Sequence, residues 1–171
     1  MGAQKGGLTH SDLVKRAEKW LRAFGCKVVL AEFHAVTNNG EIPDAIAWKF
    51  GASVLIECKA SRSDFLSDKQ KCFRKAPELG MGRYRFYMCP PHVIEKEDLP
   101  DGWGLLWVRG KHIERIVAPR GNQLMPTEEF KRFTDYGEGS EICLLVSALR
   151  RLELRGYLPE IYENVSRGIC S

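Results

Sequence analysis

Two short acidic motifs contain the residues of this chain that could do chemistry. Pro43-Asp44 is followed, after twelve residues, by Glu57-Cys58-Lys59. Each motif lies in an apolar run typical of a strand, where an unpaired charge is costly. A divalent cation held between the two carboxylates, with the lysine beside it, would explain three charges in core strands. The alternative interpretation is an edge hairpin that carries ordinary surface charges.

Strand geometry predicts how these side chains lie. Glu57 and Lys59 are two residues apart, so they project from the same face of the third strand. The intervening positions take the opposite face, where we expect a helix to pack. On the neighbouring strand Asp44 shares a side with Ile46 and Trp48, so it meets Glu57 if the register allows it.

Paired carboxylates and a lysine are suited to metal-assisted hydrolysis. Two carboxylates that close repel each other unless a cation lies between them. All-oxygen ligands favour Mg²⁺ or Mn²⁺, which can lower the pKa of a bound water and neutralise charge on a phosphate. Lys59 could orient the attacking water or stabilise transition-state charge. It could also act as a base if burial lowers its pKa.

The surrounding pattern predicts an α/β or α+β fold with a central mixed sheet flanked by helices. A helical stripe of apolar residues begins at Leu13 and ends at Phe24, with Thr9 or Ser11 as the cap and Gly25 as the stop. The expected elements, in chain order, are a helix at 10–24, strands at 27–36, 41–49 and 52–60, a helix at 63–76, a strand at 83–89, a hairpin of strands at 104–109 and 112–118, and C-terminal helices at about 126–134 and 138–156.

Size and composition bound the class of protein. The chain has 171 residues, a net charge of +4 and 44% hydrophobic residues, which is typical of one globular domain. We expect a single domain over 1–171, with a core at about 10–119 and a helical extension at about 126–156. Six scattered cysteines without metal-ligand spacing, and no apolar signal segment, favour reduced thiols in a cytoplasmic protein with no membrane partner. A phosphate-loop NTPase is excluded, because G-x-x-x-x-G-K-[ST] is absent.

The two motifs resemble those of the PD-(D/E)XK nuclease superfamily. This resemblance implies a restriction-endonuclease-like core and an Mg²⁺- or Mn²⁺-dependent enzyme that cuts phosphodiester bonds in DNA. It assigns Asp44 and Glu57 as metal ligands, with the backbone carbonyl of Cys58 as a third. Lys59 is then the catalytic lysine.

Further roles follow from the same resemblance. Many relatives carry a glutamate on the first helix, for which Glu18 is the candidate. A surface glutamate beside Lys15 and Arg22 is the alternative. Relatives often place a glutamine on the helix after the lysine, which indicates Gln70 on the packed side. A nuclease also needs cations near its site, and we expect this role for Arg62, Lys69, Lys71, Arg74 and Lys75, with a solvated basic helix face as the alternative.

Beyond the motifs, the layout is similar to the MmcB-like branch of this superfamily, a group linked to bacterial DNA repair. The chain departs from that branch at 77–82 and from 126 onward, so restriction and phage roles stay open.

Two other function classes also stay open: a non-catalytic nucleic-acid-binding or assembly module with the same fold, and an RNA-processing endonuclease. The apolar face of the last helix is expected to pack within the monomer, with an oligomer interface as the alternative. The segments that carry the branch similarity are Glu32, 43–47, 56–61, 64–65, 68–69, 84–87, 90–91 and 104–108.

Overall fold

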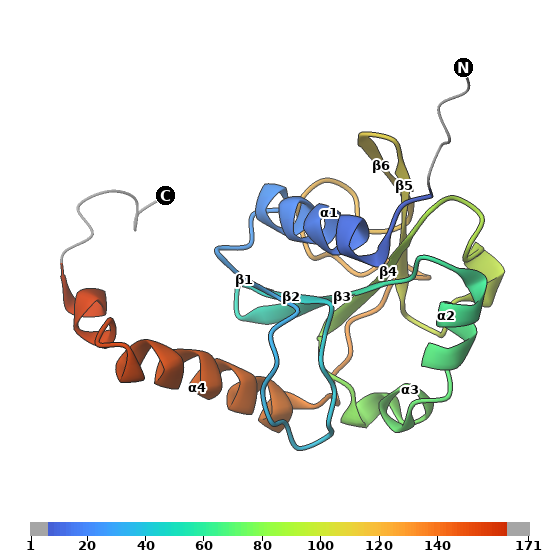
Figure 1. Cartoon of the computed structure of the whole chain (residues 1–171). Coiled ribbons are helices and arrows are strands. Elements are labelled where there is room, and N and C mark those ends of the chain that lie inside the picture. Colours follow the sequence, from blue (N-terminus) through green and yellow to red (C-terminus); the bar gives the residue numbers. More distant parts are fainter. Residues whose placement is uncertain (1–6, 164–171) are drawn as a thin grey trace.

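Six strands form one mixed sheet whose spatial order follows the chain (Figure 1). The computed structural model describes residues 7–163. The first three strands form an antiparallel meander, β3, β4 and β5 run parallel, and β6 returns antiparallel to β5. This arrangement confirms the predicted mixed α/β class. The strands are β1 (Val28–Ala31), β2 (Ala45–Lys49), β3 (Ala52–Cys58), β4 (Tyr84–Cys89), β5 (Gly104–Arg109) and β6 (His112–Val117).

Helix α1 (His10–Ala23) covers one face of the sheet (Figure 1). The backbone N–H of Asp12 donates to the Thr9 hydroxyl at 3.2 Å, and the Asp12 carboxylate accepts from the Thr9 N–H at 3.1 Å. This reciprocal cap satisfies two N–H groups that the helix itself leaves without partners. The predicted apolar stripe is buried, and its Trp20 ring lies 5.3 Å from the ring of Phe86 on β4.

The other face of the sheet is covered by α2 (Arg62–Asp68) and α3 (Cys72–Lys75). The ring of Phe65 on α2 lies edge-on to Tyr87 of β4, at 5.1 Å. The prediction of one helix over 63–76 is therefore wrong, because the chain turns at 69–71. In a continuous helix, positions 68 and 74 would be about 240° apart around the axis. The turn lets Asp68 and Arg74 face the same point beneath the sheet.

The connection between β1 and β2 is less regular than the sequence predicted. Residues 32–44 leave the sheet, and Glu32 takes a left-handed φ of 47° where β1 ends. The predicted strands at 27–36 and 41–49 are therefore shortened to β1 and β2. Asp44 therefore lies immediately before the first residue of β2 rather than within the strand.

The C-terminal region departs further from the prediction. No helix forms at 126–134. Instead Phe130 is fully buried and forms an isolated parallel bridge with Gly102, which draws this segment onto the sheet in extended form. Helix α4 (Glu138–Leu154) forms as expected and extends away from the sheet (Figure 1). Its apolar face was predicted to be buried within the monomer, but Val146 is 57% exposed and Leu149 is 49% exposed.

Short single-turn helices complete the chain: η1 (Pro77–Leu79), η2 (Lys96–Asp98) and η3 (Leu158–Tyr162). Among residues 7–163, none of the helices is both long enough and apolar enough to span a bilayer. The cysteines within this part of the chain, Cys26, Cys58, Cys72, Cys89 and Cys143, are free thiols, while Cys170 and the two ends of the predicted 1–171 domain lie outside the described residues.

Candidate functional site

The two acidic motifs meet where β2 begins and β3 ends. Ala45 is paired with Ile56 in the antiparallel register, so Asp44, one residue earlier, lies opposite Glu57. The backbone N–H of Cys58 donates to Asp44 Oδ2 at 2.7 Å. The N–H and C=O of one strand residue leave the strand on the same side, so the Cys58 carbonyl also faces the Asp44 side. Asp44, Glu57 and the Cys58 carbonyl are thus brought together.

Glu57 and Lys59 form a buried ion pair on the face predicted for them. Lys59 Nζ lies 3.0 Å from Glu57 Oε2 and 3.2 Å from Asp68 Oδ1. Burial opposes the charge on Lys59, but Glu57 and Asp68 raise its pKa above the ordinary value. This direction favours a protonated ammonium over the alternative in which burial lowers the pKa and lets Lys59 act as a base.

Asp44 differs from Glu57 in that it reaches solvent. Its side chain is 16% exposed, against 3% for Glu57. Burial, followed by repulsion from Glu57, raises the pKa of Asp44 to about 6. His10, the first residue of α1, places Nε2 3.3 Å from Asp44 Oδ1. Sequence reasoning missed His10, because the contact joins residues 34 positions apart and no motif marks it.

Beneath the site lies a set of charged side chains that we call the buried ionic cluster: Glu41, Glu57, Lys59, Asp68 and Arg74. Arg74 holds it together, because its guanidinium contacts Glu41 Oε1 at 2.5 Å, Glu57 Oε1 at 3.0 Å and Asp68 Oδ2 at 2.9 Å.

Two further groups donate hydrogen bonds to this cluster, although Glu57 Oε1 and Asp68 Oδ1 have only ion-pair contacts within the described residues. The Tyr87 hydroxyl donates to Asp68 Oδ2 at 2.9 Å, and the Met81 N–H donates to Glu41 Oε2 at 2.6 Å. Sequence reasoning missed Glu41, Asp68 and Tyr87. For Asp68 a signal existed, since it follows Phe65 by three residues on the packed face of α2.

The two auxiliary residues expected from the sequence lie away from this site. Gln70 was predicted on the packed side, but it is exposed in the turn between α2 and α3, and Asp68 takes the packed position. Glu18 forms an exposed ion pair with Arg22 one helical turn away, at 2.8 Å. This is the surface role that the sequence left as the alternative.

Most of the predicted nucleic-acid-binding cations are bound to protein oxygens. Arg62 forms a bidentate ion pair with the Asp98 carboxylate, and Lys69 Nζ donates to the backbone carbonyl of Asp98 at 2.9 Å. Lys71 Nζ lies 2.8 Å from Asp68 Oδ1. Arg74 is 3% exposed and forms part of the ionic cluster, so the prediction that it contacts nucleic acid is wrong. Only Lys75 of the set is both exposed and without a carboxylate within 4.0 Å among residues 7–163.

The donor set at Asp44 and Glu57 fits a hard divalent cation. When ionised, the three carboxylates of the buried ionic cluster exceed its two cations by one, Lys71 beside Asp68 offsets that excess, and Asp44 adds a further negative charge. The part of the chain that the structure describes contains no cluster of three or more His, Cys, Asp or Glu side chains suited to an ion. Mg²⁺ is commonly held by one or two carboxylates, with water and substrate phosphate completing its shell. Asp44 and Glu57 are a sufficient protein contribution of that kind.

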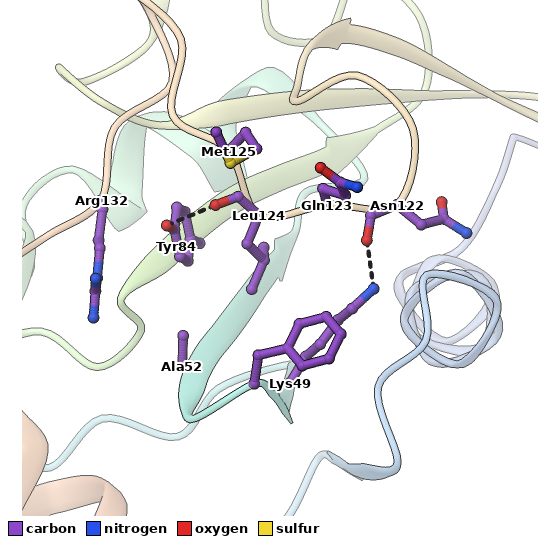
Figure 2. A pocket seen from close by; sticks show the side chains of 9 residues that line it. Lys49, Ala52, Tyr84, Asn122, Gln123, Leu124, Met125 and Arg132 are labelled. Carbon is purple, nitrogen blue, oxygen red and sulfur yellow. Dashed lines mark hydrogen bonds between the residues drawn. The ribbon is translucent and has the colours of Figure 1, made fainter. Parts of the chain in front are cut away.

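A separate cavity of about 610 Å³ opens at the other end of the sheet (Figure 2). Lys49 donates to the Asn122 carbonyl across it, and the Tyr84 hydroxyl donates to the Leu124 carbonyl at 2.9 Å. Ala52 lies five residues before Glu57 along β3, about 17 Å for an extended strand, and projects from the opposite face. This cavity is therefore not part of the acidic site.

Comparison with known proteins shows the fold alone. No family model matches the chain, and no curated protein matches it. Among solved structures, the chain is similar to a protein of unknown function from Silicibacter pomeroyi, with a TM-score of 0.57 and 24% sequence identity. The similarity covers 99% of this chain and 100% of that chain. A likeness at this level of identity shows a shared fold and carries no functional assignment.

Proposed function

We propose that this protein is a metal-dependent nuclease that hydrolyses phosphodiester bonds in DNA. The observation that carries the proposal is the placement of Asp44 opposite Glu57, with the Lys59 ammonium 3.0 Å from Glu57. The resemblance of these motifs to the PD-(D/E)XK superfamily supports DNA as the substrate. The similarity to its MmcB-like branch is an argument for a role in repair, while restriction and phage roles stay open because the chain departs from that branch at 77–82 and from 126 onward.

Each side chain has a separate task in this proposal. Asp44 and Glu57 would hold Mg²⁺ or Mn²⁺, together with the Cys58 carbonyl. The metal would supply a bound water of lowered pKa and neutralise charge on the phosphate. Lys59 would contribute a positive charge, since its ammonium lies 3.0 Å from Glu57, and Glu57 and Asp68 raise its pKa above the ordinary value. A positive charge of this kind stabilises the negative charge that develops on the phosphate.

A second candidate is a nucleic-acid-binding or assembly module that does not cut. The observation in its favour is that both carboxylate oxygens of Glu57 already contact protein cations, Lys59 on one side and Arg74 on the other. A buried ion-pair network of this kind can stabilise a fold without any metal. The same side chains would then be structural.

Cleavage assays on four variants separate the two candidates. Plasmid, linear, branched and single-stranded DNA are incubated with Mg²⁺ or Mn²⁺, with EDTA as the blank. We expect wild type to cut at least one substrate, and Asp44→Asn, Glu57→Gln and Lys59→Met to lose more than a hundredfold in rate, a typical loss for an electrostatic catalytic group. The matched control is Glu141→Gln, since Glu141 is an equally buried carboxylate that bonds to Ser53 at the other end of β3.

A second measurement tests metal binding independently of cleavage. Mg²⁺ or Mn²⁺ should raise the unfolding temperature of wild type and of Glu141→Gln, because an ion that binds only the folded state stabilises it. It should not raise that of Asp44→Asn. Cleavage that persists in Glu57→Gln and Lys59→Met would reject the assigned site. DNA binding without cleavage or a metal-dependent shift would favour the second candidate.

A further inference from the structure

A groove on the outside of α1 is lined by basic residues alone. Lys15, Arg16 and Lys19 of α1 and Lys111 of the β5–β6 turn enclose a volume of about 690 Å³. Among residues 7–163, no carboxylate oxygen lies within 4.0 Å of a side-chain nitrogen of these four residues. We call this feature the basic groove. Its charges are not neutralised by ion pairing, in contrast to those around the acidic site.

The basic groove is held in shape by Arg16. Its guanidinium donates to the Gly110 carbonyl at 2.9 Å and to the Lys111 carbonyl at 3.3 Å. These bonds tie the backbone of the β5–β6 turn to the middle of α1, which places Lys111 in the same groove as Lys15 and Lys19. Like charges gathered in one groove raise the local positive potential.

Helix α1 contacts the acidic site at its first residue and carries the groove on its outer face. The helix begins at His10, whose Nε2 lies 3.3 Å from Asp44 Oδ1. At 1.5 Å per residue, Lys15 lies about 7.5 Å along the axis from His10, and Lys19 about 13.5 Å. Phosphates of one duplex strand are spaced about 3.4 Å along the axis, so this length corresponds to roughly two to four phosphates.

We propose that the basic groove binds the phosphate backbone of a nucleic-acid strand and guides it to the acidic site. The guiding role rests on the proposed nuclease function, whereas the binding role stands on the groove itself. Lys15, Lys19 and Lys111 supply ammonium groups to successive phosphates, and Arg16 positions Lys111. Phosphate contacts of this kind provide most non-specific nucleic-acid affinity.

A polyanionic strand fits this surface better than a membrane does. A helix that lies on a bilayer needs an apolar face to insert beneath the headgroups. The apolar face of α1 is already used, because Leu13, Ala17 and Leu21 are fully buried against the sheet. The groove on its outer side is lined by charged side chains alone.

Binding measurements on a cleavage-deficient protein test this proposal. Fluorescence anisotropy gives the Kd of Glu57→Gln, in EDTA, for labelled duplex DNA, single-stranded DNA and single-stranded RNA over a range of salt. Adding Lys15→Glu and Lys19→Glu should weaken binding roughly tenfold or more at physiological salt. It should also reduce the salt slope by about 1.8 for a duplex, or about 1.4 for a single strand, as expected for two lost phosphate contacts. The comparison of DNA with RNA shows which strand the groove prefers.

The control carries the same change of charge elsewhere. Lys27 and Arg155 are exposed and lie outside the groove, so Lys27→Glu with Arg155→Glu should change Kd less than about threefold. The groove proposal would be overturned if both pairs of substitutions weakened DNA binding equally, or if the groove pair did not weaken it. Neither result would affect the conclusion from the cleavage assay. Conversely, if the groove pair weakens binding but wild type cuts none of the substrates, the groove proposal is supported and the nuclease proposal is rejected. Tighter binding to phosphatidylglycerol vesicles than to any strand would also overturn the groove proposal.

Discussion

Two groups of cations lie near the acidic site, and the protein uses them differently. The first belongs to α2 and α3, where Arg74 is buried among three carboxylates and Lys71 pairs with Asp68. The second is the basic groove on α1, where Lys15 and Lys19 are exposed and unpaired within residues 7–163. The first group neutralises the protein's own charge, and the second presents charge to a ligand.

This difference shows that closeness to a catalytic motif in sequence does not make a cation a ligand-binding residue. A buried cation stays buried only if carboxylates pair with it, and those carboxylates then cancel its field outside the protein. An exposed cation without a partner keeps its field. The two groups should therefore respond oppositely to substitution: the first through stability, and the second through affinity.

The largest effect is expected for the cation at the centre of the first group. Arg74→Met leaves Glu41, Glu57 and Asp68 with Lys59 as their one buried counter-charge. Removing one partner of a buried ion pair typically costs about 3–5 kcal/mol of unfolding free energy. For a chain of this length, this corresponds to a fall of roughly 6–20 °C in unfolding temperature. Urea and thermal unfolding followed by circular dichroism would measure both quantities.

The matched control is an arginine of the same region that forms an exposed pair. Arg62 pairs with Asp98, but its side chain is 48% exposed, so Arg62→Met should cost less than about 1 kcal/mol. Equal losses for the two variants would mean that burial does not separate these arginines. The distinction between the two groups of cations would then fail.

The second effect concerns Asp68 and depends on pH. Burial opposes its ionisation, but Arg74 and Lys59 hold the pKa of Asp68 well below its usual range. Its stabilisation is therefore present above the unfolded-state pKa of about 3.9 and is lost as pH falls below that value. Asp68→Asn should lower the unfolding free energy by about 3 kcal/mol at pH 7. The difference in unfolding free energy between this variant and wild type should become smaller as the pH falls below about 4.

Chemical unfolding of both proteins at several pH values would test this dependence. Asp64 lies on the same helix but is exposed, so Asp64→Asn should stay within about 0.5 kcal/mol of wild type throughout. A difference in unfolding free energy between Asp68→Asn and wild type that stays constant down to pH 3 would show that Arg74 and Lys59 do not lower the pKa of Asp68 in the folded protein.

Much of the fold follows from local sequence patterns. The helical spacing of apolar residues predicts α1. Short apolar runs bounded by turn residues predict β3, β4 and the β5–β6 hairpin. The failures are places where distant contacts override local preference. A helix at 126–134 would remove Phe130 from the core and from its bridge with Gly102, so the segment stays extended.

The site itself was only partly predictable, for a similar reason. Glu57 and Lys59 share a strand, and Asp44 reaches them through a short meander, so local geometry suffices. Arg74 and Glu41 are 33 residues apart, and a sequence pattern does not encode their pairing. The side chains of α2 and α3 therefore looked like a basic surface, although part of that surface faces inward.

The smallest effect is expected for the one member of the first group that is both exposed and, within residues 7–163, without a carboxylate partner. Lys75 lies at the end of α3, and among residues 7–163 no carboxylate is within 4.0 Å of its ammonium. If it touches a strand at all, it supplies a single contact, so Lys75→Glu should weaken DNA binding by less than about threefold and change the salt slope by at most about 0.9. The unfolding free energy of the Lys75→Glu variant should stay within about 0.5 kcal/mol of that of wild type. Weakening as large as that from Lys15→Glu with Lys19→Glu would place the strand across α3 instead, because one cation there would then do the work assigned to two in the basic groove.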